Sequence, residues 1–395
     1  MALPIETLGL LLFVACLVAI LSRRLSLPYS VGLVLAGLAL SVAPLSSEVP
    51  LSRELIFNLL LPPLVFEAAL QLEWKRFKNE LPLTATLAFF GVPVAAFLIA
   101  AAMHFGAGWS WIGAGLFGML IAATDPVSVI ATFKEQKADP RLRMVVESES
   151  LLNDGAAAVG FGILIAIAAG QDATPSTLLA SLTWTVGGAL LAGAVVAGMI
   201  LAIAGRTEDH LVEITLTTIA AFASFMLAEH FQASGVLATL TAGLIVGNAG
   251  WRGAISEGAR GHVTSFWEYA AFLANSVIFL VIGIHEAHQP FALLSWPIAI
   301  AIVATLGGRL ISILPLSLLF ERSRLKIDGR FKAVLFWGGL RGALALALAL
   351  AVPASVPEQL PMIVTAFAVV AFSVFVQGLT MGPLLRRLGL LAGKA

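Results

Sequence analysis

The sequence predicts an all-α integral membrane protein with about thirteen transmembrane helices. Of its 395 residues, 59% are apolar and only 12% are charged, whereas a soluble domain has about 25% charged residues. Apolar runs of 18 or more residues recur from one end of the chain to the other, and each is long enough to be a membrane-spanning helix. The alternating pattern of a membrane barrel is absent, so the expected spans are helices.

The prediction rests on thirteen apolar segments. A helix needs about 20 residues to cross the hydrocarbon core. The first segment is followed by Arg23 and Arg24 and lacks a positively charged start, which favours an uncleaved span over a signal peptide. The expected spans lie near residues 5–22, 28–45, 54–72, 82–105, 109–133, 142–169, 176–204, 211–230, 234–249, 264–283, 291–319, 331–352 and 358–385.

The distribution of basic residues predicts the orientation of these spans. If the N-terminus lies outside, the loops on the cytoplasmic side hold all but three of the 23 Lys and Arg residues. The exceptions are Arg53 in an outside loop, and Arg309 and Arg341 within spans. Because basic loops stay on the cytoplasmic side, we expect the N-terminus outside and the C-terminus in the cytoplasm. Short loops and the lack of a targeting signal favour a prokaryotic inner (plasma) membrane.

Composition also excludes several classes of site. Basic and acidic residues number 23 each, a balance that argues against a nucleic-acid partner. Cys16 is the single cysteine, so the chain forms no internal disulfide and no cysteine-rich metal site. The histidines are scattered, and no helical pair of them is expected to point inward. We expect neither an enzyme nor a bound cofactor.

Two interrupted spans indicate an internal repeat. The fifth span breaks at Thr124-Asp125-Pro126, and the twelfth breaks at the glycine-rich segment 338–342. These are corresponding positions in two six-helix halves, 5–170 and 211–385, joined by 176–204. In transporters built from inverted repeats, interrupted helices cross near the middle of the membrane and form the binding site. The sequence therefore predicts two inverted six-helix repeats with crossing helices 5 and 12.

Elementary chemistry explains both breaks. Pro126 lacks an N–H group and ends the helix before it, which leaves Asp125 as the N-cap of a new half-helix. The glycines allow the twelfth span to unwind, and Arg341 would lie at the negative end of its first half. Asp125 could bind a cation or only stabilise the break. For Arg341 we favour a structural role, in which it pairs with Glu149.

The sixth span, 142–169, carries polar residues that an ordinary membrane helix lacks: Glu147, Glu149, Ser150, Asn153 and Asp154. A charged group at this depth costs roughly 3 kcal/mol and marks a functional site by default. Ser150 and Asp154 share one helix face, as do Glu149 and Asn153. Burial favours a neutral carboxyl and a bound cation favours the ionised one. Asp154 is therefore expected to hold a small cation and a proton in turn; the alternative is a buried, hydrogen-bonded carboxyl.

Glu67 lies in the inner half of the third span, after Pro62-Pro63. At that depth it would line a vestibule beside Asp154. The alternative is a glutamate that reaches the membrane interface.

Four motifs together give the sequence a family resemblance: FEAAL (66–70), ATDPVSVIATF (123–133), ESLLNDGAA (149–157) and GGLRGALALALAL (338–350). In order and spacing they resemble the cation:proton antiporters of the NhaP and NHE type. The resemblance covers nearly the whole chain. It implies an NhaA-like antiporter fold and exchange of Na⁺ or Li⁺ for H⁺ by alternating access.

The resemblance also implies a cation site. Asp154 matches the aspartate for which cation and proton compete, and Thr124 and Asp125 match residues of the unwound helix that hold the ion. Ser150 and Glu67 match further ligands of the Na⁺ ion.

The family resemblance also implies three residues that support the cation site, and a quaternary structure. Glu149 and Arg341 match a buried ion pair, and Asn153 matches the residue that steadies the site. Family members are homodimers in which a mobile core moves against an interface bundle. By analogy, the core would be 82–170 and 291–385, and the interface part would be 5–72 and 176–283.

Several functions remain open at this level. A single aspartate favours electroneutral one-for-one exchange, and hard oxygen ligands fit Na⁺ or Li⁺. A K⁺/H⁺ antiporter of the same fold is the main alternative. A cation channel would need a selectivity filter, and the sequence shows no filter repeat. An intramembrane aspartyl protease could use Asp125 and Asp154 as a dyad, but it would have no use for the break at Arg341.

Overall fold

The computed structural model describes residues 5–25, 27–42, 52–125, 129–130, 132–133, 138–171 and 174–390. The elements of this part are helices, in the order α1 (Ile5–Leu25), α2 (Tyr29–Leu40), α3 (Leu61–Gln71), α4 (Trp74–Phe89), α5 (Gly91–Ala107), α6 (Trp111–Ala122), α8 (Pro140–Ala168), α9 (Pro175–Ala204), α10 (His210–His230), α11 (Gly235–Ala249), α12 (Glu257–Glu286), α13 (Ser295–Leu318), α14 (Gly329–Trp337), α15 (Ala343–Leu350), α16 (Gln359–Phe372) and α17 (Leu379–Leu388). A π-helical segment, Leu55–Leu60, leads into α3, and another, Ser373–Gly378, joins α16 to α17.

The all-α membrane class predicted from composition is confirmed. Every predicted span overlaps a helix, and eight helical segments of the described chain are long and apolar enough to cross a membrane. The full count of thirteen spans stays a prediction. The fourth span differs most from its expected bounds, because α4 begins at Trp74, in a charged stretch ahead of the apolar run, and a break at Phe90 separates it from α5.

The chain divides into two compact units. The first unit comprises Met1–Arg53, Pro82–Ala157 and Ser276–Ala395, and the second comprises Glu54–Leu81 and Ala158–Asn275. Boundaries fall within α4, α8 and α12, so each of these helices contributes to both units. The predicted assignment of segments to a mobile core and a dimer interface stays a prediction.

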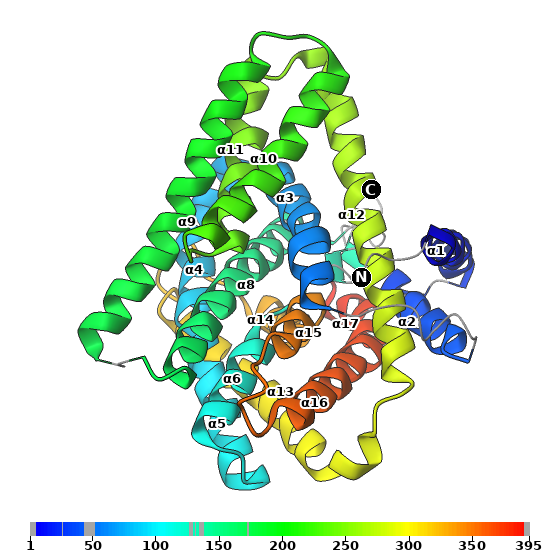
Figure 1. Ribbon diagram of the computed structural model, residues 1–395, viewed down its shortest axis with the longest axis vertical. Coiled ribbons are helices and arrows are strands. Elements are labelled where there is room, and N and C mark those ends of the chain that lie inside the picture. The colour runs from blue at the N-terminus through cyan, green and yellow to red at the C-terminus, as the bar shows by residue number, and fades with distance from the viewer. Residues whose placement is uncertain are drawn as a thin grey trace. The chain divides into compact units, whose positions relative to one another are not determined.

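In the first unit, α5 packs between α6 and α13 (Figure 1). The close approach of α5 and α6 depends on Gly118, where a Cβ atom would lie 2.2 Å from the carbonyl oxygen of Ala96. Small residues at such contacts let membrane helices approach closely enough for extensive van der Waals packing. This packing supports α6, the helix that carries the first predicted break.

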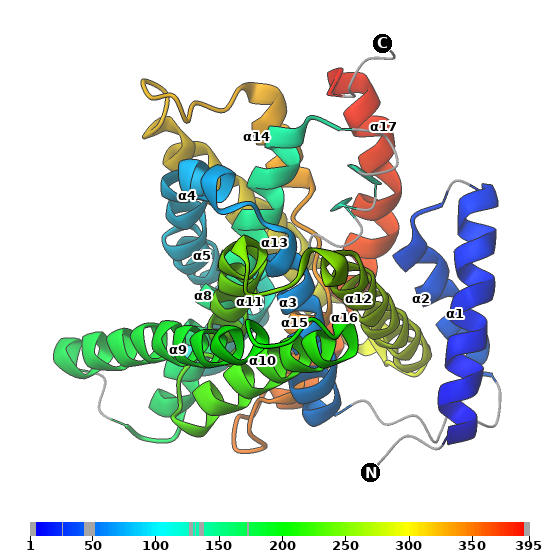
Figure 2. The ribbon, with the colours of Figure 1, turned by 90° about the horizontal axis from the view of Figure 1, so that it is seen from above.

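In the second unit, α9, α10 and α11 pack together, and α11 also packs against α3. Figure 2 shows α9 and α10 lying side by side. Contact between α11 and α3 depends on Gly247, where a Cβ atom would lie 2.2 Å from the carbonyl oxygen of Leu70. Trp267 of α12 donates a hydrogen bond from Nε1 to Thr217 Oγ1 of α10 at 3.0 Å, so its indole N–H is satisfied inside the unit.

The C-terminal half of α12 packs against α2 in the first unit. A Cβ atom on Gly283 would lie 2.3 Å from the carbonyl oxygen of Val34, and one on Gly37 would lie 2.2 Å from that of Leu280. Tyr29 and Ser276 share a 2.7 Å hydrogen bond between their hydroxyl groups at the same contact. Glycine on both helices is therefore required for their approach.

We expect Gly283→Ala to destabilise the protein by about 1–3 kcal/mol, because the added methyl group forces two packed backbones apart. The matched control is Gly9→Ala in α1, where an added Cβ atom meets nothing within 4 Å and alanine is the better helix former. Thermal unfolding of the purified protein measures both. Equal melting temperatures for the two variants would contradict this account of the α2–α12 contact.

Candidate cation site at two crossing breaks

Both predicted helix breaks are present. Helix α6 ends at Ala122, and the chain continues in a non-helical conformation through Asp125, with Ala123 extended at φ −57° and ψ 144°. Helix α14 ends at Trp337, and the next helix, α15, starts at Ala343. The predicted half-helix starting at Pro126 lies outside the described residues.

The two breaks contact each other directly. The backbone N–H of Asp125 donates a 2.8 Å hydrogen bond to the carbonyl oxygen of Leu340. Gly342 lies against the Asp125 side chain, where a Cβ atom would be 2.0 Å from Oδ2. The predicted crossing of the fifth and twelfth spans is therefore confirmed, and glycine is the residue that fits at this point.

Side chains of α8 satisfy the freed backbone of the first break. Asn153 accepts a hydrogen bond at Oδ1 from the backbone N–H of Thr124 at 3.1 Å and donates one from Nδ2 to Thr124 Oγ1 at 2.6 Å. Ser150 Oγ donates to the Thr124 carbonyl oxygen. All three residues are buried. Because unpaired backbone groups are costly in a membrane interior, these contacts fix the unwound segment against α8.

Helix α8 is continuous from Pro140 to Ala168, so the predicted spacing of its polar residues is preserved. Asp139 precedes it and accepts hydrogen bonds at Oδ1 from the backbone N–H groups of Arg141 and Leu142, as an N-cap residue does. Ser150 and Asp154 lie one turn apart on this helix. Asp154 and Asp125 are each half-buried, whereas Ser150 is fully buried.

The partner of Glu149 differs from the sequence prediction. Arg309 of α13 binds it with two parallel contacts, Nη1 to Oε1 at 2.7 Å and Nη2 to Oε2 at 2.8 Å. Asn153 Nδ2 donates to the same Oε1 at 3.1 Å. Arg309 also donates from Nε and Nη2 to the Leu335 carbonyl oxygen. The predicted pairing of Glu149 with Arg341 is wrong, because Arg309 reaches the carboxylate in the bidentate geometry that guanidinium groups favour.

Arg341 instead stabilises the second break. Its Nη1 donates a 2.7 Å hydrogen bond to the carbonyl oxygen of Gly339, and its backbone N–H donates to Ser373 Oγ at 3.0 Å. The side chain is 2% exposed. A cation beside the carbonyl groups that follow α14 offsets the negative end of that helix.

Glu67 belongs to the second unit, whereas the other predicted ligands belong to the first. It is half-buried on α3 and accepts a hydrogen bond at Oε1 from Gln71 Nε2. That it lines a vestibule beside Asp154 stays a prediction.

Sequence reasoning missed the role of Arg309. A useful signal was present, because a basic residue inside a membrane span requires a carboxylate or carbonyl partner, and Arg309 was one of two such residues. Sequence spacing does not show which arginine lies nearer to Glu149, since the approach of α13 to α8 decides it. Ser373 was missed as well, and nothing in its local sequence marks it.

Comparison with known proteins identifies the family. A family model described as "Sodium/hydrogen exchanger, transmembrane" matches residues 10–387. The chain belongs to the sodium/hydrogen exchanger family. The resemblance drawn from the four sequence motifs is thereby confirmed.

Several members of the sodium/hydrogen exchanger family resemble this chain over most of its length. The Na⁺/H⁺ antiporter ApNhaP of Aphanothece halophytica is 37% identical over 98% of this chain and 75% of its own. The Na⁺/H⁺ antiporter NhaP of Pseudomonas aeruginosa is 31% identical over 85% of this chain and 81% of its own. The solved structure of the sodium proton antiporter MjNhaP1 from Methanocaldococcus jannaschii has a TM-score of 0.77 at 21% identity, covering 97% of this chain and 98% of that one. This structural likeness confirms the predicted antiporter fold.

The ion pair can be tested with a double-mutant cycle. Combining Glu149→Gln with Arg309→Gln should give a coupling energy of about 0.5–3 kcal/mol, because the partners contact each other. Arg309→Gln alone should be the most harmful change, since it leaves a buried carboxylate unpaired, a loss of about 3–5 kcal/mol.

The matched cycle combines Glu149→Gln with Arg341→Gln and should show a smaller coupling. Shifts in the melting temperature of the purified variants measure both cycles. A larger coupling with Arg341 than with Arg309 would contradict the observed pairing.

Proposed function

We propose that this protein exchanges Na⁺ or Li⁺ for H⁺ across the membrane, one for one and without net charge movement. Relatives at 31–37% identity are named Na⁺/H⁺ antiporters, which supports the choice of ions. One structural observation supports the mechanism. Asp154 forms no hydrogen bond or ion pair with the described residues, whereas the nearby Glu149 is neutralised by Arg309.

A carboxylate without a partner in a membrane interior is unfavourable unless something neutralises it. A proton does so by forming the neutral acid, and a small cation does so by direct binding. The two ligands exclude each other at one carboxylate. Asp154 therefore alternates between one proton and one cation, and the core carries the same charge in both states.

Oxygen atoms around Asp154 supply the remaining cation ligands. We propose Thr124, Asp125, Ser150 and Glu67 for this role, because carboxylate, hydroxyl and carbonyl oxygens suit hard cations. The carbonyl and hydroxyl oxygens of Thr124 each already accept one hydrogen bond, and each retains a lone pair for an ion. Exchange of K⁺ by the same site is the alternative, and the ion-substitution assay below distinguishes the two.

Three residues support the site without binding the ion. Asn153 fixes the unwound segment at Thr124, Glu149 holds Asn153, and Arg341 stabilises the second break. The working assembly in our proposal is a homodimer in a prokaryotic plasma membrane, with the N-terminus outside and the C-terminus in the cytoplasm. Alternating access would come from movement of the core, 82–170 and 291–385, against the interface part.

Asp154→Asn should abolish exchange. An amide is uncharged and does not titrate, so it cannot exchange a bound proton for a bound cation. The measurement uses purified protein in liposomes with an imposed pH gradient, an interior pH dye, and additions of Na⁺, Li⁺ or K⁺. In the wild type, Na⁺ and Li⁺ should each collapse the pH gradient. The rate of collapse should not depend on the value at which the membrane potential is clamped.

The matched control is Asp209→Asn. Asp209 is the N-cap of α10, where Oδ1 accepts from the Leu211 N–H at 2.8 Å, and asparagine caps a helix as well as aspartate does. This variant should exchange normally. Substantial exchange by Asp154→Asn would refute the proposed site, and collapse by K⁺ alone would change the substrate.

A further inference from the structure

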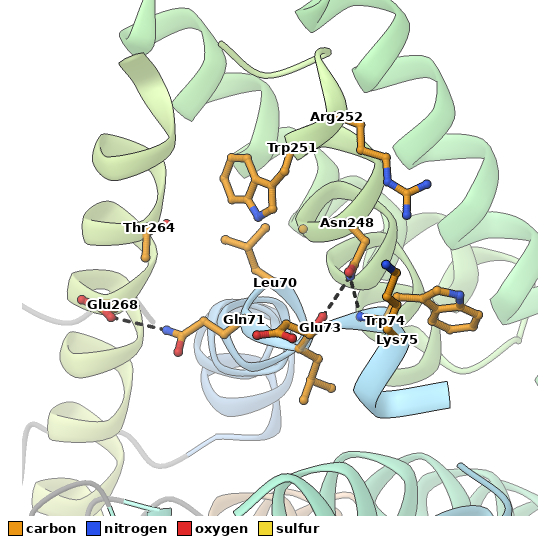
Figure 3. A pocket seen from close by; sticks show the side chains of 12 residues that line it. Leu70, Gln71, Glu73, Trp74, Lys75, Asn248, Trp251, Arg252, Thr264 and Glu268 are labelled. Atoms are coloured by element: carbon orange, nitrogen blue, oxygen red, sulfur yellow. Dashed lines mark hydrogen bonds between the residues drawn. The ribbon is translucent and has the colours of Figure 1, made fainter. Parts of the chain in front are cut away.

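The second unit contains a pocket of about 470 Å³ where α3 ends and α4 begins (Figure 3). The end of α11 and a turn of α12 complete its walls. The volume lies within the range of sites for small ligands, about 300–1,000 Å³. None of its lining residues belongs to the cation site proposed above.

One wall of the pocket carries two cations. Figure 3 shows Arg252 and Lys75 on the same side, next to Trp74. Neither forms a hydrogen bond or an ion pair with the described residues. The neighbouring Glu73 does not neutralise Lys75, because its carboxylate pairs with Arg76 at 2.9 Å. Two uncompensated cations on one wall favour an anionic group such as a phosphate.

The opposite wall carries an uncompensated carboxylate. Glu268 extends from α12, one turn after Thr264, and its Oε1 lies 3.5 Å from Gln71 Nε2 (Figure 3). Glu268 forms no ion pair with the described residues. A carboxylate with free acceptor positions favours a cation that donates several hydrogen bonds, such as a primary ammonium group.

The pocket is preformed by contacts that do not involve a ligand. Asn248 of α11 accepts a hydrogen bond at Oδ1 from the Trp74 N–H at 2.8 Å and donates one from Nδ2 to the Leu72 carbonyl oxygen at 2.9 Å. Arg260 donates to the Trp251 carbonyl oxygen and lies 5.8 Å from the centre of its ring. Trp251 is thus held between the two charged walls (Figure 3).

The position of the pocket points to a membrane lipid. It lies where apolar helices α3 and α11 end and where the charged first turns of α4 start. Trp74 at its edge is 42% exposed, and tryptophan is enriched where helices leave the hydrocarbon core. The basic residues here belong to the loops expected on the cytoplasmic side.

We propose that this pocket binds the headgroup of a phospholipid that carries a primary amine, of the phosphatidylethanolamine type. The phosphate contacts Lys75 and Arg252, the ammonium group contacts Glu268, and the methylene groups between them pack on Trp251. The zwitterion satisfies both walls at once, whereas an anionic lipid without an amine, such as phosphatidylglycerol, satisfies only the basic wall. A choline headgroup has no N–H to donate to Glu268.

The test measures lipid binding by full-length, delipidated protein in detergent. Dioleoyl phosphatidylethanolamine, phosphatidylcholine and phosphatidylglycerol are added in turn, and binding is followed by native mass spectrometry and by melting temperature. The ethanolamine lipid should bind about tenfold more tightly than the other two, as expected for one charge-assisted hydrogen-bonded contact. Glu268→Gln should remove this preference, and Lys75→Ala with Arg252→Ala should weaken binding of the ethanolamine lipid by tenfold or more.

The matched control removes two exposed arginines outside the pocket, Arg322→Ala with Arg324→Ala, and should retain the wild-type preference. Equal binding of the three lipids by the wild type, or an unchanged preference in Glu268→Gln, would overturn the proposal. Soluble glycerophosphoethanolamine that binds as tightly as the lipid would overturn it in favour of a soluble ligand. The readout is binding, so the outcome is independent of the proposed transport activity.

Discussion

A membrane interior cannot hydrate a charge, and this constraint accounts for the arrangement of the first unit. The buried ion pair between Glu149 and Arg309 cancels one negative charge inside this unit. Arg341 donates a hydrogen bond to the Gly339 carbonyl oxygen in its own helix break. These contacts leave Asp154 as a carboxylate without a hydrogen bond or ion pair in the described part of the chain. In our proposal, ion exchange follows from that difference, because Asp154 needs a mobile ligand to become neutral.

Hydrogen bonds at the two breaks satisfy several of the backbone groups that unwinding frees. The hydrogen bond from Asp125 to Leu340 joins the two breaks, and Ser150 and Asn153 hold the backbone of Thr124 against α8. The contacts that hold the two breaks come from short polar side chains and from the close approach of Gly342 to Asp125.

Sequence reasoning was most successful where the physical cause is local. Apolar length located the helices, and the glycine-rich segment 338–342 with Pro126 located both breaks, since these residues alter the backbone at their own positions. The sequence-based prediction failed where the packing of helices that are far apart in the sequence decides which residues meet. Two buried arginines were compatible with Glu149, and packing of α13 selected Arg309. The early start of α4 at Trp74 was also missed, because the charged first turns of that helix lie ahead of the apolar run.

The most direct test of competition at Asp154 is the apparent affinity for Na⁺ as a function of pH. Because the site must lose its proton before a cation binds, the Michaelis constant for Na⁺ should rise by about tenfold for each unit of pH decrease below the competing pKa, while the maximal rate at saturating Na⁺ changes little. Initial rates in liposomes, with equal pH on both sides and tracer Na⁺ exchange as the readout, measure both quantities. A Michaelis constant that is independent of pH would contradict competition at a single carboxylate.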